Sequence, residues 1–227
     1  LIVSSSMLLL FFAFLIFMND IQNRAYTAGI WRNFYGTLRV KVIPSPHGDV
    51  ACLLFGKVIH GCQYAAREKS RLPLTYFGPS SGVGLSMQIL REKEKKNLKV
   101  GVLGLGAGTI AAYGRKGEIF RFYELNPEVV EVAETHFTYL ADTPATVTTI
   151  VGDGRLALEK DLRNGSFAAY DLLVLDAFSD DTVPVHLLTK EAFAIYLRGL
   201  SQDGIIAINI STTYLDLNPV IKQLAAH

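Results

Sequence analysis

The sequence is poor in cysteine, and its positive and negative charges nearly cancel. Its 227 residues include two cysteines, Cys52 and Cys62, whose spacing matches no metal-ligand pattern. A disulfide between them is not required by the sequence, and we favour reduced cytosolic thiols. The 22 basic and 21 acidic residues leave a net charge of +1, which argues against a general nucleic-acid-binding surface. The chain also lacks internal repeats and low-complexity tracts.

Charge is absent from the first eighteen residues. Leu1–Met18 is apolar apart from three serines at positions 4–6, and its length is about the minimum for a helix that spans a bilayer. It lacks the basic region and the small-residue cleavage site of a signal peptide. We predict a transmembrane helix over 1–18, with a signal peptide and a buried core helix as alternatives. Arg24 and Arg32 then place the following domain in the cytoplasm, and the missing initial Met predicts an upstream part.

The remainder divides into a linker over 19–33, a β-rich unit over 34–81 and an α/β domain over 82–227. In the β-rich unit, short β-type stretches at Gly36–Ile43 and Val50–Phe55 flank a turn rich in proline and glycine. In the α/β domain, strands near 98–103, 119–123, 147–151, 171–175 and 204–210 alternate with helical segments. This alternation predicts a Rossmann-like, doubly wound and mostly parallel sheet. Because such a fold adds two more strands, we expect the chain to continue past residue 227.

Four of these strands end in glycines or in an acid. The first leads into Gly104, Gly106, Ala107 and Gly108, and the next three end at Glu124, Asp153 and Asp176. Parallel sheets bind ligands at the carboxyl ends of their strands, so these endings predict one crevice. A glycine turn faced by acids suits a cationic nucleoside better than a phosphate. The pattern points to S-adenosylmethionine (AdoMet) or a relative, although a purely structural tight turn is the alternative.

Each acid has an expected role and an alternative. Glu124 is placed to accept both ribose hydroxyls, as an acid does in NAD enzymes too, and Asp153 is placed to contact adenine or to cap a helix. Asp176 is followed by Asp180 and Asp181, and acids this close invite a cation. An amine substrate fits best, because a carboxylate orients an ammonium and removes its proton. A metal cluster is disfavoured, because no histidine or thiol lies at ligand spacing. The remaining alternative is a solvated acidic loop.

Several stretches together resemble the spermidine synthase-like proteins, and most of all the bacterial branch in which this domain follows membrane helices. The resemblance covers about residues 31–220. It is carried by Phe34–Val40, Gly56–Tyr64, Gly82–Leu85 and Asp176–Ser179.

The resemblance implies a Rossmann-like AdoMet fold preceded by a small antiparallel β-unit. It also implies transfer of an aminopropyl group from decarboxylated AdoMet to a polyamine, with release of methylthioadenosine and no metal. By position, Gln63 is similar to the family's glutamine on the nucleoside side, Glu124 to its ribose acid and Asp153 to its adenine acid. Asp176 is similar to the catalytic aspartate, with Asp180 or Asp181 as the acid that holds the amine.

The sequence also departs from the family pattern. Ala107 stands where spermidine synthases carry an aspartate that contacts the aminopropyl amine, and Tyr76 lies in the stretch comparable to their Tyr-His-Glu segment, where we assign it to substrate binding. Without the aspartate, ordinary AdoMet could bind at least as well as its decarboxylated form. The alternatives are therefore an AdoMet-dependent methyltransferase or lyase, or a non-catalytic nucleoside-sensing domain of a membrane protein. We also expect a small-molecule amine acceptor and a homodimer.

Overall fold

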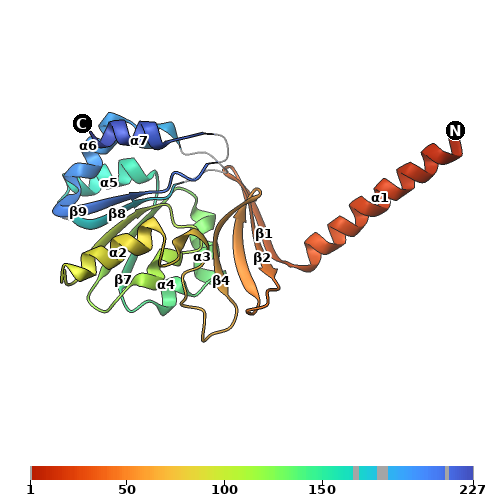
Figure 1. The fold of residues 1–227 in the computed structure, drawn as a ribbon, viewed down its shortest axis with the longest axis horizontal. Helices are drawn as coiled ribbons and strands as arrows, with labels where there is room; N and C mark the ends of the chain where they lie inside the picture. Colours follow the sequence, from red (N-terminus) through yellow and green to blue (C-terminus); the bar gives the residue numbers. More distant parts are fainter. Residues whose placement is uncertain (1, 166–168, 178–183, 213–214, 227) are drawn as a thin grey trace.

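The chain folds around two separate β-sheets, which lie next to each other in Figure 1. The computed structural model describes residues 2–165, 169–177, 184–212 and 215–226. A four-stranded antiparallel sheet has the order β1-β2-β3-β4, and a five-stranded parallel sheet has the order β7-β6-β5-β8-β9. The predicted α/β fold, with an antiparallel unit before a parallel sheet, is therefore confirmed.

The antiparallel sheet begins earlier than predicted. Its strands are β1 (Thr27–Asn33), β2 (Gly36–Ile43), β3 (Val50–Phe55) and β4 (Val58–Tyr64). Residues 19–33 are thus not a linker, because helix α1 continues to Ala25 and β1 follows at once. Trp31 explains the strand: it pairs with Leu38 of β2, and its ring packs edge-on against His136 at 4.9 Å between ring centroids. The ring contact joins residues 105 positions apart, which the sequence pattern does not reveal.

Helix α1 (Ile2–Ala25) projects away from the rest of the molecule (Figure 1). Its uninterrupted apolar stretch is Met7–Met18, twelve residues, which at about 1.5 Å per residue is shorter than the hydrocarbon core of a bilayer. Within the described part of the chain, we find no helix whose length and hydropathy together suffice to span a membrane. The predicted transmembrane helix over 1–18 is therefore not supported.

Helices cover both faces of the parallel sheet. Its strands are β5 (Lys99–Leu103), β6 (Ile119–Glu124), β7 (Thr146–Val151), β8 (Tyr170–Leu175) and β9 (Leu200–Ile208). The α-helices are α2 (Gly82–Glu92), α3 (Pro127–His136), α4 (Tyr139–Asp142), α5 (Gly154–Arg163), α6 (Lys190–Arg198) and α7 (Asn218–Ala225). Three 3-10 turns are η1 (Thr75–Phe77), η2 (Thr109–Tyr113) and η3 (Val185–Leu187). Between the first two parallel strands, where we predicted a helical segment, the chain forms only the short turn η2.

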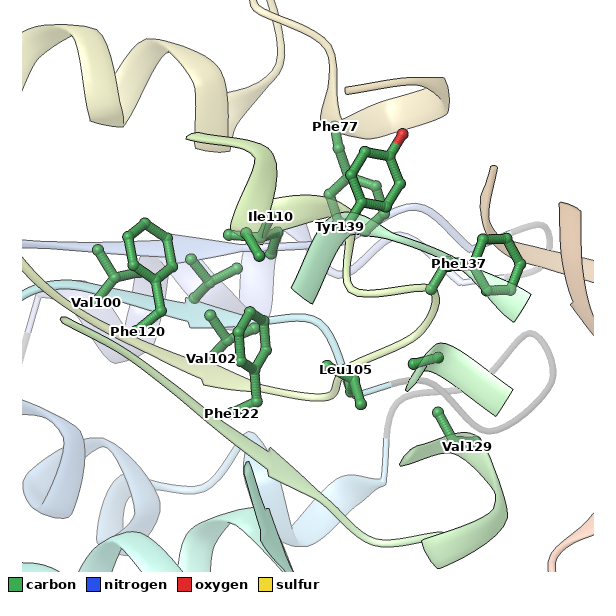
Figure 2. Close-up of a cluster of buried hydrophobic side chains, with 14 of the residues drawn as sticks. Phe77, Val100, Val102, Leu105, Ile110, Phe120, Phe122, Val129, Phe137 and Tyr139 are labelled. Atoms are coloured by element: carbon green, nitrogen blue, oxygen red, sulfur yellow. The ribbon is translucent and has the colours of Figure 1, made fainter. Parts of the chain in front are cut away.

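From Leu172 to Leu175, strand β8 is a continuous apolar run. Leu172 and Val174 join a buried cluster with α2, α3 and α4, whereas Leu173 and Leu175 join a second cluster with α5, α6 and α7. Side chains alternate along a strand and both faces of this one are covered, so these four positions are apolar. Figure 2 shows the first cluster, in which Val100 and Phe120 of neighbouring strands lie side by side.

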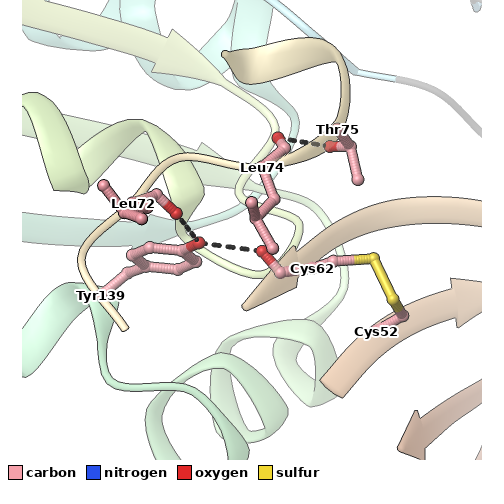
Figure 3. The surroundings of a disulfide bond; sticks show 6 residues. All are labelled: Cys52, Cys62, Leu72, Leu74, Thr75 and Tyr139. Carbon is pink, nitrogen blue, oxygen red and sulfur yellow. Dashed lines mark hydrogen bonds between the residues drawn. A yellow bond between two sulfur atoms is a disulfide. The ribbon is translucent and has the colours of Figure 1, made fainter. Parts of the chain in front are cut away.

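Cys52 and Cys62 form a disulfide, which corrects our preference for reduced thiols. The two residues are direct partners in the antiparallel pairing of β3 with β4, with 4.1 Å between their Cα atoms. This pairing could not be foreseen, because it depends on the register of β3 against β4. Figure 3 shows that the Tyr139 hydroxyl donates to the Cys62 carbonyl, at 2.8 Å. The bridge therefore sits where β4 is tied to the α/β domain.

Candidate functional site

A pocket opens at the carboxyl ends of β5 and β6, and the glycine turn after β5 forms its floor. Gly104 and Gly106 both line it with positive φ angles, +98° and +54°. A Cβ atom would lie 2.4 Å from the Asp176 carbonyl oxygen at the first position and 2.3 Å from the His60 carbonyl oxygen at the second. Only glycine fits at such distances and angles, so the turn brings β4, β5 and β8 together at one point.

Glu124 ends β6 and lines this pocket, which we call the nucleoside pocket. Its Oε2 accepts from the Leu105 backbone N–H, and its Oε1 accepts from the Asn126 N–H, both at 2.9 Å. Burial raises the pKa of Glu124, and the backbone hydrogen bonds oppose that rise. The carboxylate thus anchors the glycine turn and still faces the pocket, as the prediction for a ribose ligand requires.

Ala107 and Gly108 face away from the nucleoside pocket. Ala107 is fully buried, its N–H donates to the His60 carbonyl at 3.1 Å, and its methyl group lies against Gly61 of β4. Gly108 packs against Leu140. Both residues hold the turn against its neighbours. The side chain at position 107 therefore points toward β4, so its identity does not bear directly on which donor fits the pocket.

Asp153 lies at the mouth of the nucleoside pocket and begins α5. Its Oδ1 accepts from the Leu156 N–H at 2.9 Å, which is the helix cap that we considered as an alternative. Its Oδ2 lies 2.8 Å from Nε2 of His186, whose half-exposed side chain also lines the pocket. Asp153 therefore caps helix α5 and lines the nucleoside pocket at the same time. No sequence pattern pairs these two residues, which are 33 positions apart.

Gln63 does not line the nucleoside pocket. Its Nε2 donates to the Ser70 carbonyl and to Oγ1 of Thr138, and its Oε1 accepts from the Thr138 N–H, all at 2.9 Å. It is 4% exposed. Both amide N–H groups and the amide oxygen join β4 to residues outside the pocket, so the predicted contact with substrate is not supported by this placement.

Asp176 directly follows β8 and also lines a second pocket, which we call the acceptor pocket. It is the only residue of the described chain that lines both pockets. Burial raises the pKa of its carboxyl to about 7, with a further contribution from the charge of Glu124 and an opposing one from a hydrogen bond to Asn209. A carboxyl with this pKa exchanges a proton readily at neutral pH.

Three segments build the acceptor pocket: the 3-10 turn η1, the first residues of α2, and the end of β9 with Asn209. Tyr76 of η1 lines it, as expected for a substrate-binding residue. Desolvation of the Tyr76 hydroxyl and the nearby charge of Asp176 raise its pKa, so Tyr76 stays protonated. Asn209 was missed by the sequence analysis, although a polar residue directly after an apolar strand was a usable signal. Asp180 and Asp181 lie outside the described residues.

No protein-family model matches the sequence. The chain is similar to a polyamine aminopropyltransferase of Vibrio vulnificus, with 26% identity over 181 residues, or 76% of this chain and 56% of that protein. It is also similar to a probable polyamine aminopropyl transferase of Bifidobacterium longum, with 27% identity over 118 residues, or 48% of this chain and 23% of that protein. The chain thus spans about half the length of the first relative and less of the second.

A solved structure, a probable spermidine synthase from Corynebacterium glutamicum, has a TM-score of 0.62 to this chain. The two share 19% sequence identity, over 80% of this chain and 63% of that one. This likeness establishes the fold. Together with the named relatives it supports the resemblance to the spermidine synthase-like proteins, whereas the bacterial branch with membrane helices stays a prediction.

Proposed function

We propose that the chain transfers an aminopropyl group from decarboxylated AdoMet to a small amine. The observation that carries the proposal is the position of Asp176, the one described residue shared by the two pockets. A transfer between two substrates needs a point where both meet, and a carboxylate with a pKa of about 7 at that point suits proton removal from an ammonium. The names of the relatives support the same reaction class.

The proposed step balances in atoms and charge. Asp176 takes a proton from the incoming ammonium, which frees the nitrogen lone pair. The nitrogen then forms a bond to the carbon next to the sulfonium, and the carbon–sulfur bond breaks with its electron pair going to sulfur. Methylthioadenosine leaves as a neutral thioether, and the positive charge passes from sulfur to nitrogen.

Electrostatics supports a cationic donor in the nucleoside pocket. Glu124 and Asp176 both line it, and their charges interact strongly enough to raise the pKa of Asp176. Like charges this close favour a bound cation, because it relieves their mutual repulsion. A sulfonium is such a cation, whereas a dinucleotide would bring its phosphates toward two acids. We therefore favour an AdoMet-type ligand over NAD.

The donor and the product are tested together. The protein is incubated with AdoMet or with decarboxylated AdoMet, each with and without putrescine or spermidine, and the nucleoside product is identified by chromatography and mass. We expect methylthioadenosine that forms only when both decarboxylated AdoMet and an amine are present. S-adenosylhomocysteine would instead indicate methyl transfer, methylthioadenosine from AdoMet without amine would indicate a lyase, and binding without turnover would indicate a sensor domain.

The geometry of the site does not bear on two of the predictions made from the sequence. A cytoplasmic location of the α/β domain and a homodimer remain predictions, to be tested by fractionation of cells and by light scattering of the purified protein.

A further inference from the structure

Asn209 follows the last residue of β9 and reaches across to the neighbouring strand end. Its Nδ2 donates to Oδ1 of Asp176 at 2.6 Å. The backbone holds this geometry, since the Asn209 N–H donates to the Leu175 carbonyl at 2.9 Å and so continues the β8–β9 ladder by one residue. The two side chains therefore meet because their strands are parallel neighbours that end at the same level.

The direction of the Asn209 amide is fixed. Its Oδ1 accepts from the Ser211 backbone N–H at 3.0 Å, and a backbone N–H can donate only to the oxygen of the amide. Nδ2 must therefore face Asp176. An amide that cannot rotate presents a permanent donor to one carboxylate oxygen and leaves the other oxygen for the reaction.

We propose that Asn209 is the positioning residue of the transfer: it orients the Asp176 carboxylate between the two pockets and keeps it in the charged form that accepts a proton. The use of the Asp176 charge in the reaction rests on the proposed function, whereas the hydrogen bond between Asn209 and Asp176 does not. Asn209 acts on the substrates through Asp176.

The surroundings of Asp176 explain why such a donor is needed. The titratable groups of the described chain that interact with its charge are Glu124, at the end of β6, and Tyr76, on η1. Glu124 repels the charge and burial disfavours it, whereas the Asn209 hydrogen bond favours it. Without that bond, a smaller fraction of Asp176 would be charged at neutral pH and able to take a proton.

Titration of the free protein tests the contact without any reaction. Carboxyl carbons of aspartate are labelled with carbon-13, and the Asp176 signal is assigned by its loss in Asp176→Asn. In Asn209→Ala we expect its midpoint to rise by about one pH unit or more, because a hydrogen bond to the charged form is lost. Asn164→Ala, an exposed asparagine at the end of α5, is the matched control and should leave the midpoint unchanged.

A second variant covers the case in which Asn209→Ala does not fold. Asn209→Asp keeps the oxygen that accepts from Ser211 and replaces only the donor, so the loop retains its hydrogen bond. The new carboxylate repels Asp176, and the upper midpoint of the coupled pair should lie higher still. An unchanged Asp176 midpoint in the folded variants would overturn the inference.

The pH dependence of turnover links the contact to the reaction. A shift of the Asp176 pKa from about 7 to about 8 lowers the charged fraction at pH 7 about fivefold and changes it little at pH 9. Asn209→Ala should therefore lose rate at pH 7 and recover it at pH 9. A loss that is equal at both pH values would contradict a role through Asp176. If the wild type shows no turnover, the proposed function fails, and the titration still decides the contact.

Discussion

The nucleoside pocket and the acceptor pocket meet at Asp176 but differ in how the chain builds them. Consecutive strand ends of the parallel sheet supply Gly104, Gly106, Glu124 and Asp153 to the nucleoside pocket, and each follows a recognisable apolar run. The acceptor pocket comes from three segments that carry no motif of their own. A site that follows from sheet topology can be predicted from the sequence, whereas one that depends on how distant segments pack cannot.

The largest effect should come from the residue that the two pockets share. Asp176→Asn removes the proton acceptor but keeps the size of the side chain, so kcat should fall by about 10²–10⁴-fold. The affinity for methylthioadenosine, a neutral nucleoside, should change little. Calorimetric titration and steady-state kinetics on the same preparation measure both. Turnover near the wild-type rate would show that the two pockets do not exchange a proton through Asp176.

The disulfide should stabilise the fold by tying β3 to β4, the strand that contributes His60 to the nucleoside pocket. The bridge spans a sequence separation of 10, and removing it with the double variant Cys52→Ser/Cys62→Ser should lower the free energy of unfolding by about 2–3 kcal/mol. Thermal or urea denaturation, with the reduced wild type as control, measures the loss. Equal stability of the oxidised and reduced proteins would contradict a structural role for the bridge.

The glycine turn offers a change confined to the nucleoside pocket. Gly106→Ala places a methyl group 2.3 Å from the His60 carbonyl oxygen, so β4 must move away and methylthioadenosine affinity should fall by at least about tenfold. Gly48→Ala is the matched control, since Gly48 also has a positive φ but no atom within 4 Å of the added carbon. If Gly106→Ala binds the nucleoside as tightly as Gly48→Ala and the wild type, the close approach to His60 does not shape the pocket.

The smallest effect should fall on the acceptor side. Tyr76→Phe removes one hydroxyl beside Asp176, which should raise the KM for the amine a few fold, in keeping with the loss of one hydrogen bond. The affinity for methylthioadenosine should stay the same, because Tyr76 does not line the nucleoside pocket. A change in nucleoside affinity instead would show that the two pockets are not separate.

The sequence was most informative where one local pattern determined the structure. The apolar runs predicted all five strands of the parallel sheet, and their endings placed Glu124, Asp153 and Asp176 at one edge. It was less informative where the register of an antiparallel pair decided the outcome, as for the disulfide. Asn209 belongs to the same class, since its role depends on where β9 stops relative to β8. Gln63 shows the converse, because a residue assigned by resemblance can be fully occupied by its local partners.

A crystal structure of the protein with methylthioadenosine and putrescine bound together tests the central claim most directly. We predict the nucleoside between the glycine turn and Glu124, and the amine in the pocket lined by Tyr76, with its nitrogen within hydrogen-bond distance of the Asp176 carboxylate. The nitrogen of the amine should face the sulfur of the nucleoside with room for the transferred carbon between them, and the carboxylate should lie beside that path. Both ligands in one pocket, or an amine that does not contact Asp176, would contradict the account.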